Sequence, residues 1–169
     1  KSKKFNLAII GGSQGAKIFD ESFSKLICEI SKKRELTIVH QTQKNNIKKL
    51  KNFYRSKKIK NKVFHFNKDL MSMVKNTDLC ITRAGASSLS ELLILNIPFV
   101  AIPLPTSKDN HQYENAKFFQ SKKCCWILEE KNLKKKYLYK FFKNIVLKKK
   151  EYLLKLSSMK KINKEYSWK

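Results

Sequence analysis

Apolar residues recur along this 169-residue chain with two different periods. Short apolar runs, such as residues 5–10 (FNLAII), are typical of buried β-strands, whereas apolar residues three or four positions apart, as in residues 16–33, are typical of amphipathic helices. The two patterns alternate along the chain. Strands are predicted at residues 5–10, 36–40, 63–66, 78–82, 97–103 and 124–128, and helices at residues 16–33, 46–57, 70–74 (capped by Asp69), 87–95, 110–121, 133–146 and 151–168.

Continuously apolar strands that alternate with helices predict a parallel sheet that is covered on both faces. The expected fold class is therefore α/β: a Rossmann-like parallel sheet with helices on both faces. The sequence shows no internal repeat. We assign residues 1–150 to this domain and residues 151–169 to a carboxyl-terminal helical tail.

The composition is that of a folded domain. Apolar residues make up 41% of the chain, which argues against disorder even at a formal net charge of +25. No apolar run approaches the roughly 18 residues that cross a bilayer, so we expect a soluble or peripheral protein. The four cysteines show no CxxC spacing and are predicted to be small buried residues in a reducing compartment. The chain lacks an initiator Met and a signal-peptide pattern, which leaves open that it is a piece of a longer protein.

The positive charge comes mainly from lysine and has three explanations. Drift in coding composition ranks first, because lysine occurs together with abundant asparagine and isoleucine. An anionic membrane surface ranks second, since clustered lysines gain about 1 kcal/mol each near acidic lipid. Nucleic acid ranks last, because the sequence shows neither arginine forks nor an aromatic platform.

Three of the four glycines lie within five positions, in the stretch IIGGSQGAK of residues 9–17. Ligands of parallel sheets bind at the carboxyl ends of strands, in loops that lead into helices. Gly11, Gly12 and Gly15 allow a sharp turn and the close approach of a phosphate, and the following helix presents its positive end to that anion. Ser13 adds a hydroxyl donor. The alternative is a strand–helix turn that is rich in glycine for packing alone.

A second loop, RAGASSLSE at residues 83–91, also follows a strand and opens a helix. Ser87 or Ser88 is predicted to cap that helix. Glu91 is either a first-turn carboxylate, as in a capping box, or an acceptor for sugar hydroxyls such as a ribose diol. Two phosphate-type loops in one sheet favour a nucleotide-sugar ligand over an isolated helix cap.

A third loop, PLPTSKDNHQ at residues 103–112, is long and polar before its helix. Asn110, His111 and Gln112 would face the same cleft if the three loops converge. Otherwise this segment is a surface connector, which is the commoner role of such loops.

Five motifs in a fixed order and spacing carry a resemblance to a known family. They are GGSQGA at residues 11–16, HQT at 40–42, FNKDL at 66–70, RAGASSLSE at 83–91 and DNHQYENA at 109–116. Over residues 5–130 the chain resembles the carboxyl-terminal half of the bacterial lipid-II-forming N-acetylglucosaminyltransferases, the MurG family. These are two-domain enzymes of the GT-B glycosyltransferase fold.

The resemblance implies an activity and a place in the cell. The family transfers N-acetylglucosamine from UDP-N-acetylglucosamine to undecaprenyl-pyrophosphoryl-N-acetylmuramoyl-pentapeptide in peptidoglycan synthesis, with inversion to a β-1,4 linkage. It is peripheral to the cytoplasmic face of the bacterial plasma membrane. This chain would bind the donor, and the lipid-linked acceptor would bind an amino-terminal domain that is not in this chain.

No catalytic residue is expected in this chain, because the family's proposed general base is a histidine of the amino-terminal domain. His40, His65 and His111 do not match that motif, and the first two are expected to be core or strand-end histidines. No Asp-x-Asp pair is present, so neither a metal nor a cofactor is expected. Helix N-termini and hydroxyls would instead stabilise the charge on the leaving UDP. We expect the isolated chain to bind UDP-N-acetylglucosamine weakly and to transfer nothing.

The resemblance also assigns roles to individual residues. Ser13 would lie near the diphosphate, and Phe66 would cover the uracil. The main chain of Asn67 would bind the uracil edge, although the family commonly has an aliphatic residue there. Glu91 would bind the ribose, and Gln112 the N-acetylglucosamine. The other predicted substrate-binding residues are Gly12, Gln14, Gly15, Arg83, Ala86, Ser87, Ser88, Leu89, Ser90 and His111.

Two other classes of function stay open. A donor-binding subunit that needs a separate partner chain would be similar to the eukaryotic split transferase that makes chitobiosyl-dolichol, whose counterpart of GGSQGA lacks the SQG run. A non-catalytic basic domain that binds nucleic acid would show DNA affinity that falls steeply with salt and is unaffected by UDP.

Overall fold

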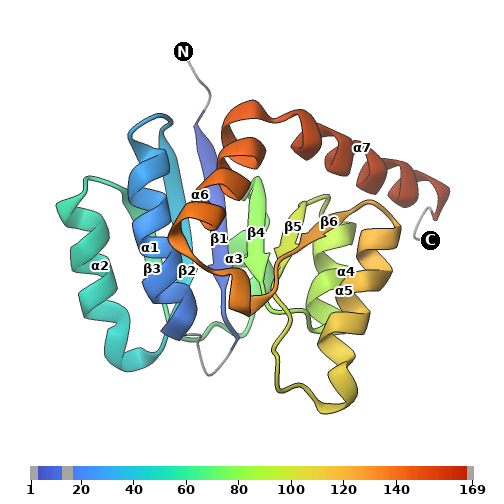
Figure 1. Cartoon of the computed structure of the whole chain (residues 1–169), viewed down its shortest axis with the longest axis horizontal. Coiled ribbons are helices and arrows are strands. Elements are labelled where there is room, and N and C mark those ends of the chain that lie inside the picture. The colour runs from blue at the N-terminus through green and yellow to red at the C-terminus, as the bar shows by residue number, and fades with distance from the viewer. Residues whose placement is uncertain (1–3, 13–16, 167–169) are drawn as a thin grey trace.

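Six parallel strands form one sheet in the order β3-β2-β1-β4-β5-β6, with helices on both faces (Figure 1). The structure is a computed structural model that describes residues 4–12 and 17–166. The predicted fold class, a Rossmann-like parallel sheet, is confirmed. The strands are β1 (Phe5–Ile10), β2 (Leu36–Gln41), β3 (Lys60–Phe64), β4 (Leu79–Thr82), β5 (Phe99–Ala101) and β6 (Cys125–Ile127).

A helix follows each of the six strands. After each of the first five, the helical connection returns the chain to the starting edge of the sheet, so the next strand runs parallel to the last. The α-helices are α1 (Lys17–Ser31), α2 (Ile47–Ser56), α3 (Leu70–Val74), α4 (Ala86–Ile94), α5 (His111–Ser121), α6 (Lys135–Lys143) and α7 (Lys150–Glu165). Short turns of other helical types are η1 (Lys44–Asn46), η2 (Lys108–Asn110), η3 (Glu130–Asn132) and η4 (Asn144–Lys148).

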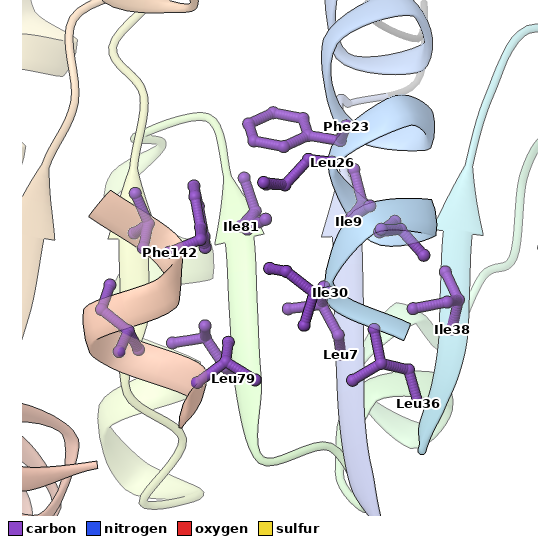
Figure 2. Close-up of a cluster of buried hydrophobic side chains, with 14 of the residues drawn as sticks. Leu7, Ile9, Phe23, Leu26, Ile30, Leu36, Ile38, Leu79, Ile81 and Phe142 are labelled. Carbon is purple, nitrogen blue, oxygen red and sulfur yellow. The ribbon is translucent and has the colours of Figure 1, made fainter. Parts of the chain in front are cut away.

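Alternate residues of each strand enter two separate apolar layers. Leu7 and Ile9 of β1 belong to the layer that α1, α2 and α6 cover, whereas Ala8 and Ile10 belong to the layer that α3, α4 and α5 cover. Figure 2 shows the first layer, in which apolar side chains of α1 and α6 lie over those of the central strands. Because both faces are covered, the central strands β1, β4 and β5 are largely apolar rather than alternating.

The last helix lies at the amino edge of the sheet, opposite the loops that follow the strands (Figure 1). Tyr152 of α7 packs in the first apolar layer and Met159 in the second. The Asn163 side-chain amide donates a hydrogen bond of 2.8 Å to the Leu93 carbonyl at the end of α4. The division between residues 1–150 and a helical tail at residues 151–169 stays a prediction.

β3 ends earlier than predicted. It stops at Phe64, which pairs with Gln41 of β2, so His65 and Phe66 lie beyond the strand. The strand ends there because β2, its neighbour in the sheet, also ends at that residue. β3 is an edge strand, and exposed lysines such as Lys60 disfavour pairing with the edge of another chain.

The predicted cap of α4 is wrong. Gly85, in an extended conformation, is the N-cap residue, and its carbonyl accepts a helical hydrogen bond of 3.1 Å from the Leu89 amide. Ser87 and Ser88 therefore lie within the first turn rather than at the cap. Glu91 lies in the second turn, so it is neither a first-turn carboxylate nor a capping-box partner.

The cysteines are small core residues rather than bonded pairs. All four are free thiols; Cys80, Cys124 and Cys125 are buried as predicted, and Cys28 is half-buried. Burial raises the pKa of Cys124 to about 11 and that of Cys125 to about 12, so both stay protonated at neutral pH. Within residues 4–12 and 17–166, every helix is too short or too polar to cross a membrane.

Candidate functional site

The loops that were predicted to bind a ligand leave the same edge of the sheet. β4 lies between β1 and β5, and Thr82 at its end pairs with both Ile10 and Ala101. Because these strands are parallel, the loops after them start side by side. The Arg83 amide donates to the Ile10 carbonyl (3.4 Å), and the Ile102 amide donates to the Thr82 carbonyl (2.8 Å). The beginnings of the three loops are therefore joined.

The glycine loop (residues 11–16) has a left-handed residue at its second position. Gly12 has a φ of +92°, which side-chain-bearing residues rarely adopt, so the backbone conformation requires glycine here. Its amide donates to Oε1 of Gln41 (3.0 Å), and Nε2 of Gln41 donates to the His65 carbonyl (3.2 Å). The predicted site residues Ser13, Gln14 and Gly15 lie outside the described residues.

Gln112, at the start of α5, joins the second loop to the third. Its Oε1 accepts hydrogen bonds from the amides of Ala84 (3.1 Å) and Leu104 (2.9 Å). Asn115, one turn later, donates to the Ala84 carbonyl (3.0 Å). The Nε2 group of Gln112 has no hydrogen-bond partner among the described residues, so it is the end that can reach a ligand. The sequence pattern pointed to Gln112 but not to its role in joining loops, and it missed Asn115.

Arg83 was predicted as a substrate-binding residue, and its guanidinium group has three protein partners. Its Nη1 donates to Oε2 of Glu130 (2.7 Å) and to the Ile102 carbonyl (3.3 Å). The guanidinium carbon lies 4.7 Å from the ring centre of Phe19 in α1. Arg83 thereby holds α1 and η3 against the loop after β4. Sequence reasoning gave Glu130 no such role.

A closed polar network lies beside this edge, between α1, β2 and α2. Nε2 of His40 is 2.9 Å from Oδ1 of Asp20, and Nδ1 of His40 is 2.7 Å from the hydroxyl of Tyr54. Oδ2 of Asp20 accepts from Thr42 (2.6 Å) and from Asn46 (2.7 Å). His40 is fully buried, which confirms the prediction of a core histidine.

Burial and hydrogen bonding shift the pKa values of this network. Burial by itself raises the pKa of the Asp20 carboxyl, but the hydrogen bonds from His40, Thr42 and Asn46 and the charge interaction with His40 together hold that pKa below its ordinary value. Burial, reinforced by the nearby Asp20 charge, keeps the pKa of Tyr54 well above its ordinary value. The Asp20 carboxylate can only accept, so Nε2–H of His40 donates to it, and the Tyr54 hydroxyl stays protonated as the partner of Nδ1.

The loop after β3 (residues 65–69) presents an aromatic ring to solvent. Phe66 is 63% exposed. Oδ1 of Asn67 accepts from the Asp69 amide (2.9 Å), and Asp69 caps α3 by accepting from the Ser72 amide (3.1 Å), as predicted for Asp69. The Asn67 side-chain oxygen is therefore engaged in this local turn.

The first turns of α4 present polar groups at the same edge. Ser87 and Glu91 are exposed and Ser88 is half-buried, whereas the side chain of Leu89 is fully buried in the core. The Ser90 hydroxyl donates to the Ala86 carbonyl (2.9 Å). Leu89 can therefore meet a ligand only through its main chain.

The third loop ends in a turn with two left-handed residues, Asp109 (φ 51°) and Asn110 (φ 55°). His111, which follows them, is exposed, and its Nδ1 is 2.7 Å from the Lys108 carbonyl. Asn110 lines a hollow of about 320 Å³ with residues of the third loop and of the segment after β6. Across residues 4–12 and 17–166, no group of three or more His, Cys, Asp or Glu side chains is arranged to hold a metal ion.

Comparison with known proteins adds three findings. The sequence matches the glycosyltransferase family 28 C-terminal domain over residues 6–169. A protein of Pelagibacter ubique named UDP-N-acetylglucosamine–N-acetylmuramyl-(pentapeptide) pyrophosphoryl-undecaprenol N-acetylglucosamine transferase is 47% identical over 163 residues, which are 96% of this chain and 46% of that protein. The crystal structure of Acinetobacter baumannii MurG superposes with a TM-score of 0.82 at 25% identity, covering 94% of this chain and 48% of the other.

A further solved structure has a similar length. The solution structure of ALG13 superposes with a TM-score of 0.57 over 86% of this chain and 87% of the other, and at 16% identity it is a likeness of fold alone. By contrast, the chain spans about half the length of the Pelagibacter and Acinetobacter proteins.

Proposed function

This chain belongs to the family of glycosyltransferase family 28 C-terminal domains, and on that premise we propose that it is the donor-binding half of an inverting N-acetylglucosaminyltransferase. The donor is UDP-N-acetylglucosamine, and the acceptor is undecaprenyl-pyrophosphoryl-N-acetylmuramoyl-pentapeptide. The product is the lipid-linked disaccharide used in peptidoglycan synthesis. The observation that carries this proposal is the set of hydrogen bonds, in part through the side chains of Gln41 and Gln112, that joins the loops after β1, β3, β4 and β5 at one edge of the sheet.

In this proposal the diphosphate binds between the helices that open at this edge. The first turns of α1 and α4 present their positive ends and main-chain amides to the anion. The hydroxyls of Ser13, Ser87 and Ser88 add donors, with the residues Gly12, Gln14 and Gly15 allowing close approach. The same groups stabilise the charge that develops on UDP as the glycosidic bond breaks, without a metal ion.

The rest of the donor binds to the flanking loops. The exposed ring of Phe66 covers the uracil, and the main chain of Asn67 binds its edge. Glu91 accepts hydrogen bonds from the ribose hydroxyls. The Nε2 group of Gln112 donates to the N-acetylglucosamine while its Oε1 holds the two loops, and His111 lies beside it.

The acceptor and the general base belong to the part of the enzyme that this chain does not contain. The chain spans 46% of the length of its Pelagibacter relative, which leaves room for a second domain of similar size. A peripheral position at the cytoplasmic face of the bacterial plasma membrane is part of the proposal. An anionic lipid surface for the lysine-rich helices also stays a prediction, as does the expectation that nucleic acid is not a partner.

Calorimetric titration of the 169-residue chain with UDP-N-acetylglucosamine tests the site. We expect weak but measurable binding, and a loss of about tenfold to a hundredfold in affinity for Glu91→Ala, since a charged hydrogen-bond partner is removed. Glu165→Ala, at the far end of α7, is the matched control and keeps the wild-type affinity. Equal affinity of Glu91→Ala and wild type would remove the assignment of the ribose site. No binding by the wild-type chain would remove the proposed function.

An assay with the lipid-linked acceptor tests the division of labour. The chain alone is expected to transfer no sugar, because the acceptor domain and the general base are missing. Turnover by the isolated chain contradicts this expectation.

A donor-binding subunit that works with a separate partner chain is the second candidate. The likeness to ALG13, at 16% identity, is one of fold alone and does not choose between the two candidates. The genomic sequence upstream of this chain separates the two candidates. An in-frame glycine-rich domain there supports the two-domain enzyme, and its absence supports the separate subunit.

A further inference from the structure

Gln41 is the last residue of β2 and lies between two loops of the candidate site without being one of its predicted ligand contacts. It is only 4% exposed. Its Oε1 accepts the Gly12 amide of the glycine loop at 3.0 Å, and its Nε2 donates to the His65 carbonyl of the loop after β3 at 3.2 Å. One side-chain amide therefore joins two loops that are far apart in the sequence.

The strand order explains why this contact comes from β2. β2 lies between β1 and β3, so the glycine loop after β1 and the loop after β3 are not neighbours. The loop after β3 is already joined to β2 by the Thr42 amide, which donates to the Phe64 carbonyl (2.8 Å), and by Nδ1 of His65, which is 3.2 Å from the Thr42 carbonyl. The Gln41 side chain extends this connection across β2 to Gly12.

The chemistry of the contact selects the amide group. At the Gly12 end Gln41 must accept a hydrogen bond, and at the His65 end it must donate one. A carboxylate can only accept, and a thioether of the same length can do neither well. Because Gly12 has a left-handed backbone with few intrinsic restraints, an external hydrogen bond is an effective way to orient the start of its loop.

We propose that Gln41 is a positioning residue that sets the spacing between the diphosphate-binding loop and the uracil-binding loop, so that both ends of UDP bind together. This inference rests on the proposed function, in which the diphosphate lies at the glycine loop and Phe66, next to His65, covers the uracil. Loops held at the correct spacing need not be ordered by the ligand, which strengthens binding. The benefit is largest for a ligand that contacts both loops, and small for uridine or pyrophosphate alone.

The test compares the wild-type chain with Gln41→Met and Gln41→Glu in titrations with UDP, uridine and pyrophosphate. At about pH 8, we expect both variants to bind UDP about tenfold more weakly, since each lacks the donor to His65. The affinities for uridine and for pyrophosphate change by less than about threefold. Gln120→Met and Gln120→Glu are the matched controls. Gln120 is exposed and lies near the carboxyl end of α5, whereas the candidate site is at the amino end of that helix.

The acid side of the pH profile distinguishes positioning from a general loss of structure. At about pH 5, protonation of the introduced carboxyl in Gln41→Glu restores both an acceptor and a donor, and burial favours this neutral form. Its affinity for UDP, relative to wild type, then recovers to within about threefold, whereas Gln41→Met does not recover. The titratable groups at this corner, namely His65 and the buried pair Asp20 and His40, are present in every protein compared.

The outcomes distinguish a failure of the positioning role from a failure of the proposed function. If the wild type fails to bind UDP, both fall. If the wild type binds UDP and Gln41→Met binds it within about twofold, or if Gln41→Glu shows no recovery at low pH, the positioning role is wrong while the proposed function stands. Circular dichroism checks that each variant is folded, and if Gln41→Met is not, the pH profile of Gln41→Glu decides alone.

Discussion

His40 and Gln41 are adjacent in β2, yet the His40 ring is bonded to side chains whereas the Gln41 amide is bonded to main-chain groups. His40 points into the layer of α1 and α2, where it contacts the side chains of Asp20 and Tyr54. Gln41 points to the other face and contacts the main chain of two loops. The network around His40 joins regular elements and closes on itself, so it contributes stability. The amides of Gln41 and Gln112 join loops, so they set the geometry of a ligand site.

The largest expected effect breaks the closed network. His40→Leu leaves the Asp20 carboxylate and the Tyr54 hydroxyl buried without their ring partner, and we expect the free energy of unfolding to fall by about 3 kcal/mol. Urea denaturation followed by circular dichroism measures this. The control His111→Leu removes an exposed ring and changes stability by less than about 0.5 kcal/mol. A stable His40→Leu protein would show that the network carries little of the folding free energy.

A smaller effect distinguishes the two loop-joining amides. Oε1 of Gln112 accepts two main-chain amides, so Gln112→Glu keeps these contacts, whereas Gln112→Met leaves both amides without a partner. We expect Gln112→Met to lower the free energy of unfolding by about 1–2 kcal/mol, and Gln112→Glu to change it by less than half of that. Equal losses in the two variants would contradict the assignment of Oε1 as the joining atom. At Gln41, where a donor is also needed, glutamate is expected to fail at neutral pH.

The smallest expected effect is a pH dependence of the free energy of unfolding. The network around His40 has it because Asp20 titrates, whereas the side-chain amides of Gln41 and Gln112 do not titrate. The folded pKa of Asp20 is below its ordinary value of 3.8. The ionised carboxylate therefore contributes stability above that value, and this contribution is lost as the pH falls through the lower folded pKa. Urea denaturation between about pH 5 and pH 2 should show a loss that is weaker in Asp20→Asn. Gln112→Met should keep the wild-type slope, since an amide does not titrate.

The regular elements could be predicted from the sequence because their signals are local. The apolar run at residues 5–10 coincides with β1, and the Asp69 cap of α3 was correctly placed by residue type and spacing. The end of β3 was misplaced because His65 and Phe66 continue an apolar pattern whose pairing partner has already ended. The cap of α4 was misplaced because serine is the better cap by type, whereas the chain after β4 enters the helix at Gly85.

The sequence by itself determined the succession of strands and helices along the chain, the family, and which loops lie at the carboxyl edge of the sheet. These could be predicted because periodicity and glycine spacing are properties of short segments. Only the tertiary structure decided how those loops are joined. Gln41 meets Gly12 across 29 residues, and Gln112 meets Ala84 across 28. The physical reason is that a side-chain amide has no preferred partner until strand pairing brings a main-chain donor or acceptor within hydrogen-bonding distance.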